Sequence, residues 1–255
     1  MCGVKFKSIR SLLWKLNASK DKFAKLDTII VRDRSNDKNE YEKFDGLLPE
    51  EYVFIPDADP RSIMAKHARS YLKKRGITEE DIYKYQIGYC DDGPYAERII
   101  IPSYNSKGDI NFFIGRSFDT ETYLKYKFPM VSKDLVPFEM FINWDLPIIL
   151  CEGGFDMISI KRNAIPLLGK EINTTLMKKL ISPRVKTIYV VLDNDALKTS
   201  LQHCNELLSY GKEVYLVLPE GGKDPSEMGF SKFTKMIQQA RPLTLSKILQ
   251  LKTTL

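Results

Sequence analysis

The feature that most constrains the fold is an alternation in the second half of the chain, where short apolar runs are separated by amphipathic helical stretches. The apolar runs cover residues 147–151, 164–168, 186–192 and 213–218. Strands that alternate with helices in this way form a parallel sheet, and the helices cover its faces. The pattern therefore predicts an α/β fold with a parallel sheet of about four strands and flanking helices.

Acidic residues follow three of these apolar runs. They are Glu152 and Asp156 after the first run, Asp193 and Asp195 after the third, and Asp224 after the fourth. Ligands bind at the carboxyl ends of the strands in open α/β sheets. We therefore expect these side chains to converge at one edge of the sheet.

Carboxylates gathered in this way favour a metal-dependent reaction. They would repel one another and raise one another's pKa unless a multivalent cation neutralised them. Hard oxygen ligands suit Mg²⁺ or Mn²⁺, and bound Mg²⁺ keeps several waters and bridges to substrate phosphates. Such ions can polarise a triphosphate, orient an attacking hydroxyl and stabilise the leaving pyrophosphate, which is the chemistry of nucleotidyl transfer.

The part of the chain before the alternation predicts an α+β subdomain. Residues 61–86 have the pattern of helix, turn and helix, in which Gly76 ends the first helix and Thr78 caps the second. Residues 98–102 and 110–115 are apolar runs separated by a polar turn, which is typical of a β-hairpin.

These patterns divide the chain into four predicted parts. The parts are a basic helical arm with a linker over residues 1–60, the α+β subdomain over 61–145, the parallel-sheet domain over 146–230 and a helical segment over 231–255. Within the first part, residues 4–34 have apolar positions at helical spacing. Residues 33–60 are polar, contain Pro and Gly, and show little periodicity, so we interpret them as the linker.

The composition limits the classes of protein to which the chain can belong. No apolar stretch approaches the roughly 20 residues of a membrane span, and the N-terminus lacks a signal-peptide pattern, so we expect a cytoplasmic protein without a membrane partner. The four cysteines and two histidines form no CxxC pair, so neither a disulfide framework nor a complete zinc ribbon can be assembled. Six basic residues and no acid fall within residues 61–75, which indicates either a solvated helix face or a nucleic-acid surface.

Two of the acidic motifs resemble the signature of a known domain. Glu152-Gly153-Gly154-Phe155-Asp156, followed by Asp193-Asn194-Asp195, resembles the signature of Toprim domains, which occur in DnaG-type primases, topoisomerases and certain nucleases. Further motifs resemble the catalytic core of bacterial and phage DnaG-type primases, and they lie at residues 71–77, 85–89, 98–102, 115–116, 125–126, 150–156 and 167–169. The resemblance spans about residues 65–230, in family order.

This resemblance implies roles for individual residues. The positions that match the metal-site acids of the family are Glu152, Asp156, Asp193, Asp195 and Asp224. Of these, Glu152, Asp193 and Asp195 are the catalytic candidates, and Glu152 is either a general base or a metal ligand. The positions that match nucleotide or nucleic-acid contacts are Arg98, Arg116, Lys125, Tyr126 and Lys223.

The chain departs from the family pattern at three places. Ser226 stands where the family usually has an acid, and the asparagine expected after Lys125-Tyr126 is absent. Met1-Cys2-Gly3 resembles only the end of the zinc ribbon that usually begins these primases, so residues 1–60 resemble a remnant of the ribbon connection. Since a closed zinc site needs four ligands, zinc is not expected in this chain.

The resemblance implies template-directed synthesis of short RNA primers on single-stranded DNA, with Mg²⁺ or Mn²⁺ as the cofactor. The implied partners are the DNA template, nucleoside triphosphates, the RNA primer and a replicative helicase, and the pattern is compatible with a phage origin. Two alternatives stay open. One is a Toprim nuclease that uses the same acids to hydrolyse phosphodiesters, and the other is a non-catalytic nucleic-acid-binding accessory factor of replication.

Overall fold

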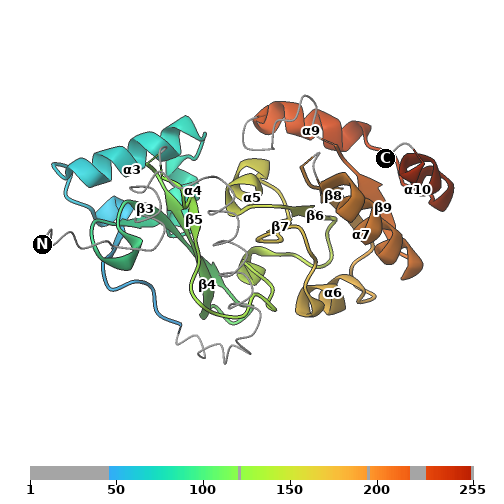
Figure 1. Cartoon of the computed structure of the whole chain (residues 1–255), viewed down its shortest axis with the longest axis horizontal. Helices are drawn as coiled ribbons and strands as arrows, with labels where there is room; N and C mark the ends of the chain where they lie inside the picture. Colours follow the sequence, from blue (N-terminus) through green and yellow to red (C-terminus); the bar gives the residue numbers. More distant parts are fainter. Residues whose placement is uncertain (1–45, 120–121, 194–195, 219–227, 254–255) are drawn as a thin grey trace, which may run out of the picture. The chain divides into compact units, whose positions relative to one another are not determined.

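The computed structural model describes residues 46–119, 122–193, 196–218 and 228–253 (Figure 1). The basic helical arm expected over residues 4–34 lies outside the described residues. Every described residue belongs to one compact unit, which begins at residue 43. Among the described residues, no helix combines the length and apolar character that crossing a membrane requires.

The first half of the described chain forms an antiparallel sheet of five strands in the order β1-β2-β3-β4-β5. The elements are β1 (Tyr52–Phe54), η1 (Ile55–Asp57), α3 (Ile63–Lys74), α4 (Glu79–Lys84), β2 (Gly88–Cys90), η2 (Gly93–Tyr95), β3 (Arg98–Tyr104), β4 (Ile110–Ser117), β5 (Tyr126–Lys127) and η3 (Glu139–Phe141). The β3-β4 pair is the predicted hairpin. In contrast, residues 52–57 are not the linker that we expected, because β1 pairs with β2 and Ile55 is fully buried.

The second half forms a parallel sheet of four strands in the order β7-β6-β8-β9. The elements are β6 (Ile148–Cys151), α5 (Gly154–Ile160), β7 (Ala164–Pro166), α6 (Thr174–Leu180), β8 (Thr187–Val191), α7 (Leu197–Ser209), β9 (Glu213–Leu216), α9 (Phe230–Gln239) and α10 (Leu245–Lys252). The predicted α/β fold is therefore confirmed, with each strand slightly shorter than its apolar run. The proposed domain boundaries at residues 60, 145 and 230 stay predictions.

The hydrophobic core follows the alternation of side chains along the strands. Ile149 and Cys151 of β6 share a core cluster with residues of α5 and α9, whereas Ile148 and Leu150 share one with residues of α6, α7 and α10. Successive side chains of a strand point to opposite faces, so a strand covered on both faces is apolar throughout. The core on the α5 side also contains residues of α3, α4 and the antiparallel sheet, so one core joins the two halves.

α3 ends before Gly76 and α4 is capped by Thr78, as the sequence predicts, although α4 ends at Lys84, before residue 86. Gly76 has a φ of +71° after the end of α3, a conformation that glycine adopts without steric cost. The hydroxyl of Thr78 accepts a hydrogen bond from the backbone of Asp81, whose carboxylate accepts one from the Thr78 backbone. The same carboxylate pairs at 2.8 Å with Lys161 at the end of α5, so this cap also connects the two halves.

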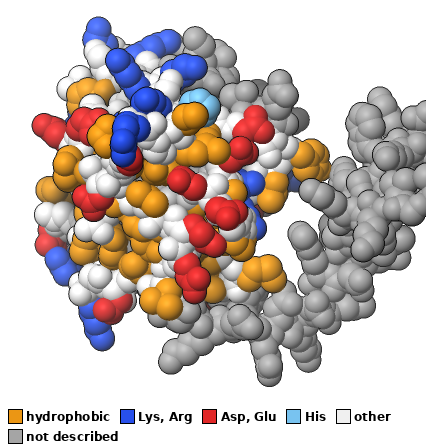
Figure 2. All heavy atoms as spheres, turned by 90° about the vertical axis from the view of Figure 1, so that its left-hand side faces the viewer, with side chains coloured by type: hydrophobic (Ala, Val, Ile, Leu, Met, Phe, Trp, Pro, Cys, Tyr) orange, Lys and Arg blue, Asp and Glu red, His pale blue; other side chains and the backbone are white. Residues whose placement is uncertain are grey.

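The basic side chains of residues 61–75 do not form one uniform surface. Figure 2 shows lysines and arginines gathered at the end of the molecule where α3 lies in Figure 1. Arg61 pairs with Asp59 at 3.0 Å, and Arg69 donates to the backbone oxygen of Ile55 at 2.8 Å. Both residues therefore have local structural partners, while the exposed Lys73 and Lys74 extend into solvent.

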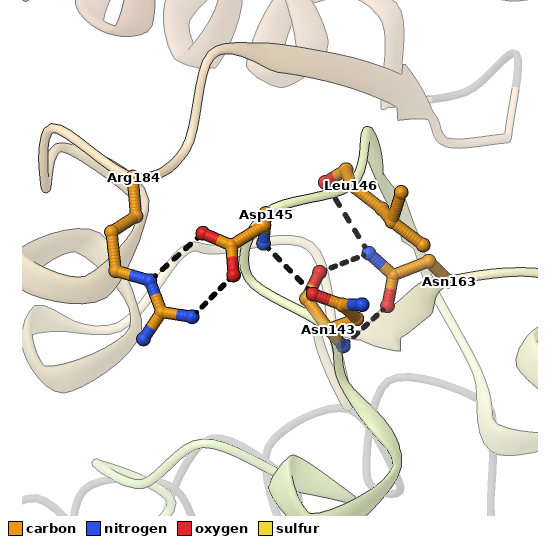
Figure 3. A network of polar contacts seen from close by, with 5 residues as sticks. All are labelled: Asn143, Asp145, Leu146, Asn163 and Arg184. Carbon is orange, nitrogen blue, oxygen red and sulfur yellow. Dashed lines mark hydrogen bonds and ion pairs between the residues drawn. The ribbon is translucent and has the colours of Figure 1, made fainter.

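Asn163 connects the loop before β6 to the loop before β7 (Figure 3). Its side-chain amide donates to the backbone oxygens of Asn143 at 2.8 Å and Pro147 at 3.1 Å, and its side-chain oxygen accepts from the Asn143 amide at 3.0 Å. On the other side of this loop, the exposed Asp145 carboxylate receives two hydrogen bonds from Arg184.

We expect Asn163→Ala to lower the free energy of unfolding by about 1–3 kcal/mol, because several backbone groups lose their partner at once. Urea unfolding followed by circular dichroism measures the change. Asp145→Ala is the matched control in the same loop. It removes only an exposed ion pair and should leave the midpoint nearly unchanged. Equal effects of the two substitutions would contradict the role assigned to Asn163.

Candidate active site

Two acidic residues meet because their strands are neighbours. β6 and β8 pair in parallel, with Cys151 opposite Val191, and Glu152 follows β6 directly while Asp193 lies two residues beyond β8. The Asp193 amide donates a hydrogen bond of 3.0 Å to the Glu152 carboxylate. This bond fixes one carboxylate oxygen of Glu152 at the carboxyl end of the sheet, where the sequence predicts the site.

A third carboxylate is supplied by the first turn of α5. Asp156 is 9% exposed, and its carboxylate accepts a 3.1 Å hydrogen bond from the Gly153 amide. A Cβ on Gly154 would lie 2.4 Å from a methyl group of Ile114 in the antiparallel sheet. Because Gly154 has no side chain, α5 can begin close to β4, and because Gly153 has none, the Asp156 carboxylate can lie against its backbone.

These carboxylates line a cavity of about 460 Å³ between the two sheets. Its charged lining residues are three acids and three bases, namely Glu152, Asp156, Asp193, Arg75, Arg116 and Lys125. Its remaining lining comes from Ile114, Tyr126, Phe128, Gly153, Gly154, Leu168 and Gly169. One wall thus carries negative charge at the ends of parallel strands, and the antiparallel sheet with the end of α3 supplies positive charge.

Aromatic rings hold the basic wall in place. Arg116 and Tyr126 are paired residues of β4 and β5, and the Arg116 guanidinium lies 4.4 Å above the centre of the Tyr126 ring. The Arg116 Nε also donates to the hydroxyl of Tyr71 at 3.0 Å. Burial raises the pKa of Tyr126, a shift that Arg116 opposes and Asp156 adds to, so the phenol stays protonated at neutral pH.

Arg75 lines the cavity and lies in the motif at residues 71–77, but it was not predicted as a site residue. Its guanidinium lies 5.5 Å from the ring centre of Tyr71 and 5.6 Å from that of Phe155. The signal in the sequence was its position directly before Gly76, where a helix ends. The end of α3 directs Arg75 to the cavity, whereas its neighbours Lys73 and Lys74 are exposed.

The structure brings together most of the predicted site residues that it describes. Those that line the cavity are Glu152, Asp156, Asp193, Arg116, Lys125 and Tyr126. Asp195, Lys223 and Asp224 lie outside the described residues. Arg98 does not line the cavity; it is 9% exposed, and its guanidinium donates to the backbone oxygens of Leu124 at 2.9 Å and Lys125 at 3.3 Å.

The chemistry of the carboxylate wall fits a hard divalent cation, because it offers only oxygen ligands of the kind that Mg²⁺ and Mn²⁺ prefer. Within the part of the chain that the structure describes, no group of three His, Cys, Asp or Glu side chains lies close enough to hold a metal ion by itself. The thiol of Cys151, the residue before Glu152, is fully buried. Burial raises its pKa well above the usual range, so the thiol is neutral.

The fold and the position of the cavity define a class of protein: the described chain has the α/β fold of the DnaG-type primase catalytic core. It superposes on the catalytic core of the Escherichia coli primase with a TM-score of 0.62 at 18% identity, covering 75% of this chain and 78% of that one. For the Aquifex aeolicus primase, solved with its zinc-binding and RNA polymerase domains, the TM-score is 0.61 at 22% identity, over 72% of this chain and 57% of that one.

Curated proteins of similar sequence are named DNA primase. The Thermotoga maritima DNA primase is 25% identical over 82% of this chain and 45% of its own length. The Listeria innocua DNA primase is 25% identical over 68% of this chain and 36% of its own length. This chain thus spans less than half the length of these relatives, and no family model matches it. The predicted resemblance to the DnaG-type primase core is confirmed.

Proposed function

We propose that this protein is a DNA primase, which synthesises short RNA primers on single-stranded DNA by metal-dependent nucleotidyl transfer. The observation that carries the proposal is the cavity itself, where carboxylates at the ends of parallel strands face arginine and lysine side chains. A triphosphate needs both kinds of group, since its oxygens bind cations and its reacting end requires a metal held by acids. Curated relatives named DNA primase support the same reaction.

Each wall of the cavity has a part in the reaction. Arg116, held by Tyr71 and Tyr126, presents its guanidinium for paired hydrogen bonds to phosphate oxygens, and Lys125 adds a second cation. Glu152, Asp156 and Asp193, together with Asp195 and Asp224, would hold Mg²⁺ or Mn²⁺, and the ion would supply Lewis-acid stabilisation of the triphosphate and the leaving pyrophosphate. The Asp193 amide fixes the orientation of the Glu152 carboxylate at the carboxyl end of the parallel sheet.

The partners of the reaction follow from the same proposal. They are a single-stranded DNA template, nucleoside triphosphates and the RNA primer, and the protein works in the cytoplasm beside a replicative helicase. One of the similar solved structures is a DnaG primase catalytic domain bound to single-stranded DNA, which supports the choice of template. The exposed Lys73 and Lys74, next to the cavity residue Arg75, are a suitable surface for the DNA backbone.

One assay separates the three candidate functions. The protein is incubated with a single-stranded template labelled in one colour, ribonucleotides labelled in another, and Mg²⁺, and the products are resolved on a denaturing gel. Short labelled RNA supports the primase, and shortened DNA identifies a Toprim nuclease instead. DNA that is retained on a filter but unchanged in length, without new RNA, would identify the non-catalytic accessory factor.

We expect a chelator to stop primer synthesis, because phosphoryl transfer at carboxylates requires the divalent ion. Addition of EDTA in excess of Mg²⁺ should reduce labelled RNA to background, and excess Mg²⁺ or Mn²⁺ should restore it. A template-binding measurement in parallel shows whether the protein itself stays intact. Continued synthesis in EDTA would contradict a reaction at the carboxylate wall.

A further inference from the structure

Arg98 has the charge and the position in sequence of a phosphate-binding residue, yet it lies on the wrong side of its sheet for that role. Ile99 of β3 pairs with Arg116 of β4, so these two side chains share the face that borders the cavity. Arg98 is the next residue along the strand and pairs with Ser117. Its side chain therefore starts from the opposite face.

The guanidinium of Arg98 reaches the edge of the sheet and binds backbone there. Its Nη2 donates to the Leu124 oxygen at 2.9 Å, and its Nη1 donates to the Lys125 oxygen at 3.3 Å. The Lys125 oxygen also accepts from the Ser117 amide at 2.9 Å. Two neighbouring carbonyl groups, directly before Tyr126, are thus fixed by one planar cation.

The segment that Arg98 holds leads into a very short strand. β5 consists of two residues and pairs with β4 only through Tyr126 and Lys127. The side chains before it face solvent, with Tyr123 82% and Leu124 52% exposed. Because few apolar contacts fix residues 122–125, the direction of the Lys125 side chain depends on how its backbone is held.

We propose that Arg98 is a positioning residue, whose guanidinium holds the Leu124–Lys125 backbone so that Lys125 and Tyr126 form the basic wall of the cavity. The residue acts from behind that wall and does not contact substrate phosphate. The expected change in KM rests on the proposed primase function. The effect of Arg98 on the backbone of residues 122–127 can be measured in the free protein, without substrate.

Three variants of the full chain test the proposal. Arg98→Met keeps an unbranched side chain similar to the aliphatic part of arginine and removes every donor, and Arg98→Lys keeps the charge without the planar pair of donors. Lys125→Gln is the matched control, since it removes the cation from the cavity and leaves both backbone oxygens held. Hydrogen exchange of the amides at residues 122–127 is measured in each free protein, together with the KM for nucleoside triphosphate and kcat.

We expect Arg98→Met to accelerate exchange in this segment by about tenfold, because two hydrogen bonds from a charged group are lost. Arg98→Lys should show a smaller increase, and Lys125→Gln should leave exchange unchanged. Both Arg98→Met and Lys125→Gln should raise the KM by about tenfold. The KM of the double variant should exceed that of either single variant by less than about twofold, because both substitutions act through the same cation. A simple loss of folded protein would instead lower kcat at constant KM.

Two results would overturn the inference. One is unchanged exchange at residues 122–127 in Arg98→Met. The other is a slope of log K against log salt concentration that is smaller in magnitude by about one for DNA binding by that variant, as expected for a lost phosphate contact. If Arg98→Met loses protection in β6 and β8 as well, it has unfolded, and the same comparison is made with Arg98→Lys. If the wild-type protein makes no primers, the proposed function fails, while the exchange data still decide the role of Arg98.

Discussion

Asp193→Asn should reduce primer synthesis to background, a loss of roughly 10³-fold, while DNA binding stays within about twofold of the wild type. The substitution keeps the shape of the side chain and the backbone amide that holds Glu152, but it removes a negative charge from the carboxylate wall. The rate should fall because, in the proposed function, the acids bind the divalent ion and the basic residues bind the template. Quantified gel products and filter retention of labelled DNA give the two readouts.

The control for this prediction is Asp145→Asn, which neutralises an exposed carboxylate outside the cavity. It should leave primer synthesis unchanged. If Asp193→Asn retained more than about a tenth of the wild-type rate, the carboxylate wall would not be the catalytic one. An equal decrease in synthesis and DNA binding would indicate a damaged fold rather than a lost metal ligand.

Phe155→Ala should lower the free energy of unfolding by about 3–5 kcal/mol, the largest effect on stability that we expect from a single substitution next to the cavity. Phe155 is 1% exposed, and it meets the Tyr71 ring edge to face at a centroid distance of 6.0 Å. Its removal leaves a void in the core between the sheets and takes away one of the two rings beneath Arg75. Urea unfolding followed by circular dichroism measures the change.

Phe230→Ala is the matched control, because this phenylalanine is 46% exposed at the start of α9. Its truncation should change stability by less than about 1 kcal/mol. A change below about 1 kcal/mol for Phe155→Ala as well would mean that the core between the sheets is not continuous at this point.

The parts of the fold that follow a strong local pattern could be predicted from the sequence. The first helix expected within residues 61–86 is α3 (Ile63–Lys74), which ends before Gly76 as predicted, since its cap residues and its apolar spacing agree. β1 was missed because it has three residues in a polar stretch between prolines. Its strand conformation comes from pairing with β2, which local propensity does not reveal.

The acidic half of the site was easier to predict than the basic half. Parallel strands place the residues that follow them at one edge, so Glu152 and Asp193 could be brought together without knowledge of packing. For the basic residues, the register of an antiparallel pair decides which face each side chain takes. Arg98 and Arg116 have the same charge at the ends of paired strands, and only the pairing of Ile99 with Arg116 separates them.

The core shared by both sheets has a consequence for any attempt to divide the protein. A fragment that carries only the parallel sheet would retain the acids but expose the apolar side of α5, and a fragment with only the antiparallel sheet would expose its own inner face. Neither piece should be stably folded alone, so mixing the two separately purified halves should give aggregates instead of a reconstituted enzyme. A design that moves the candidate site into another protein would therefore have to include both sheets.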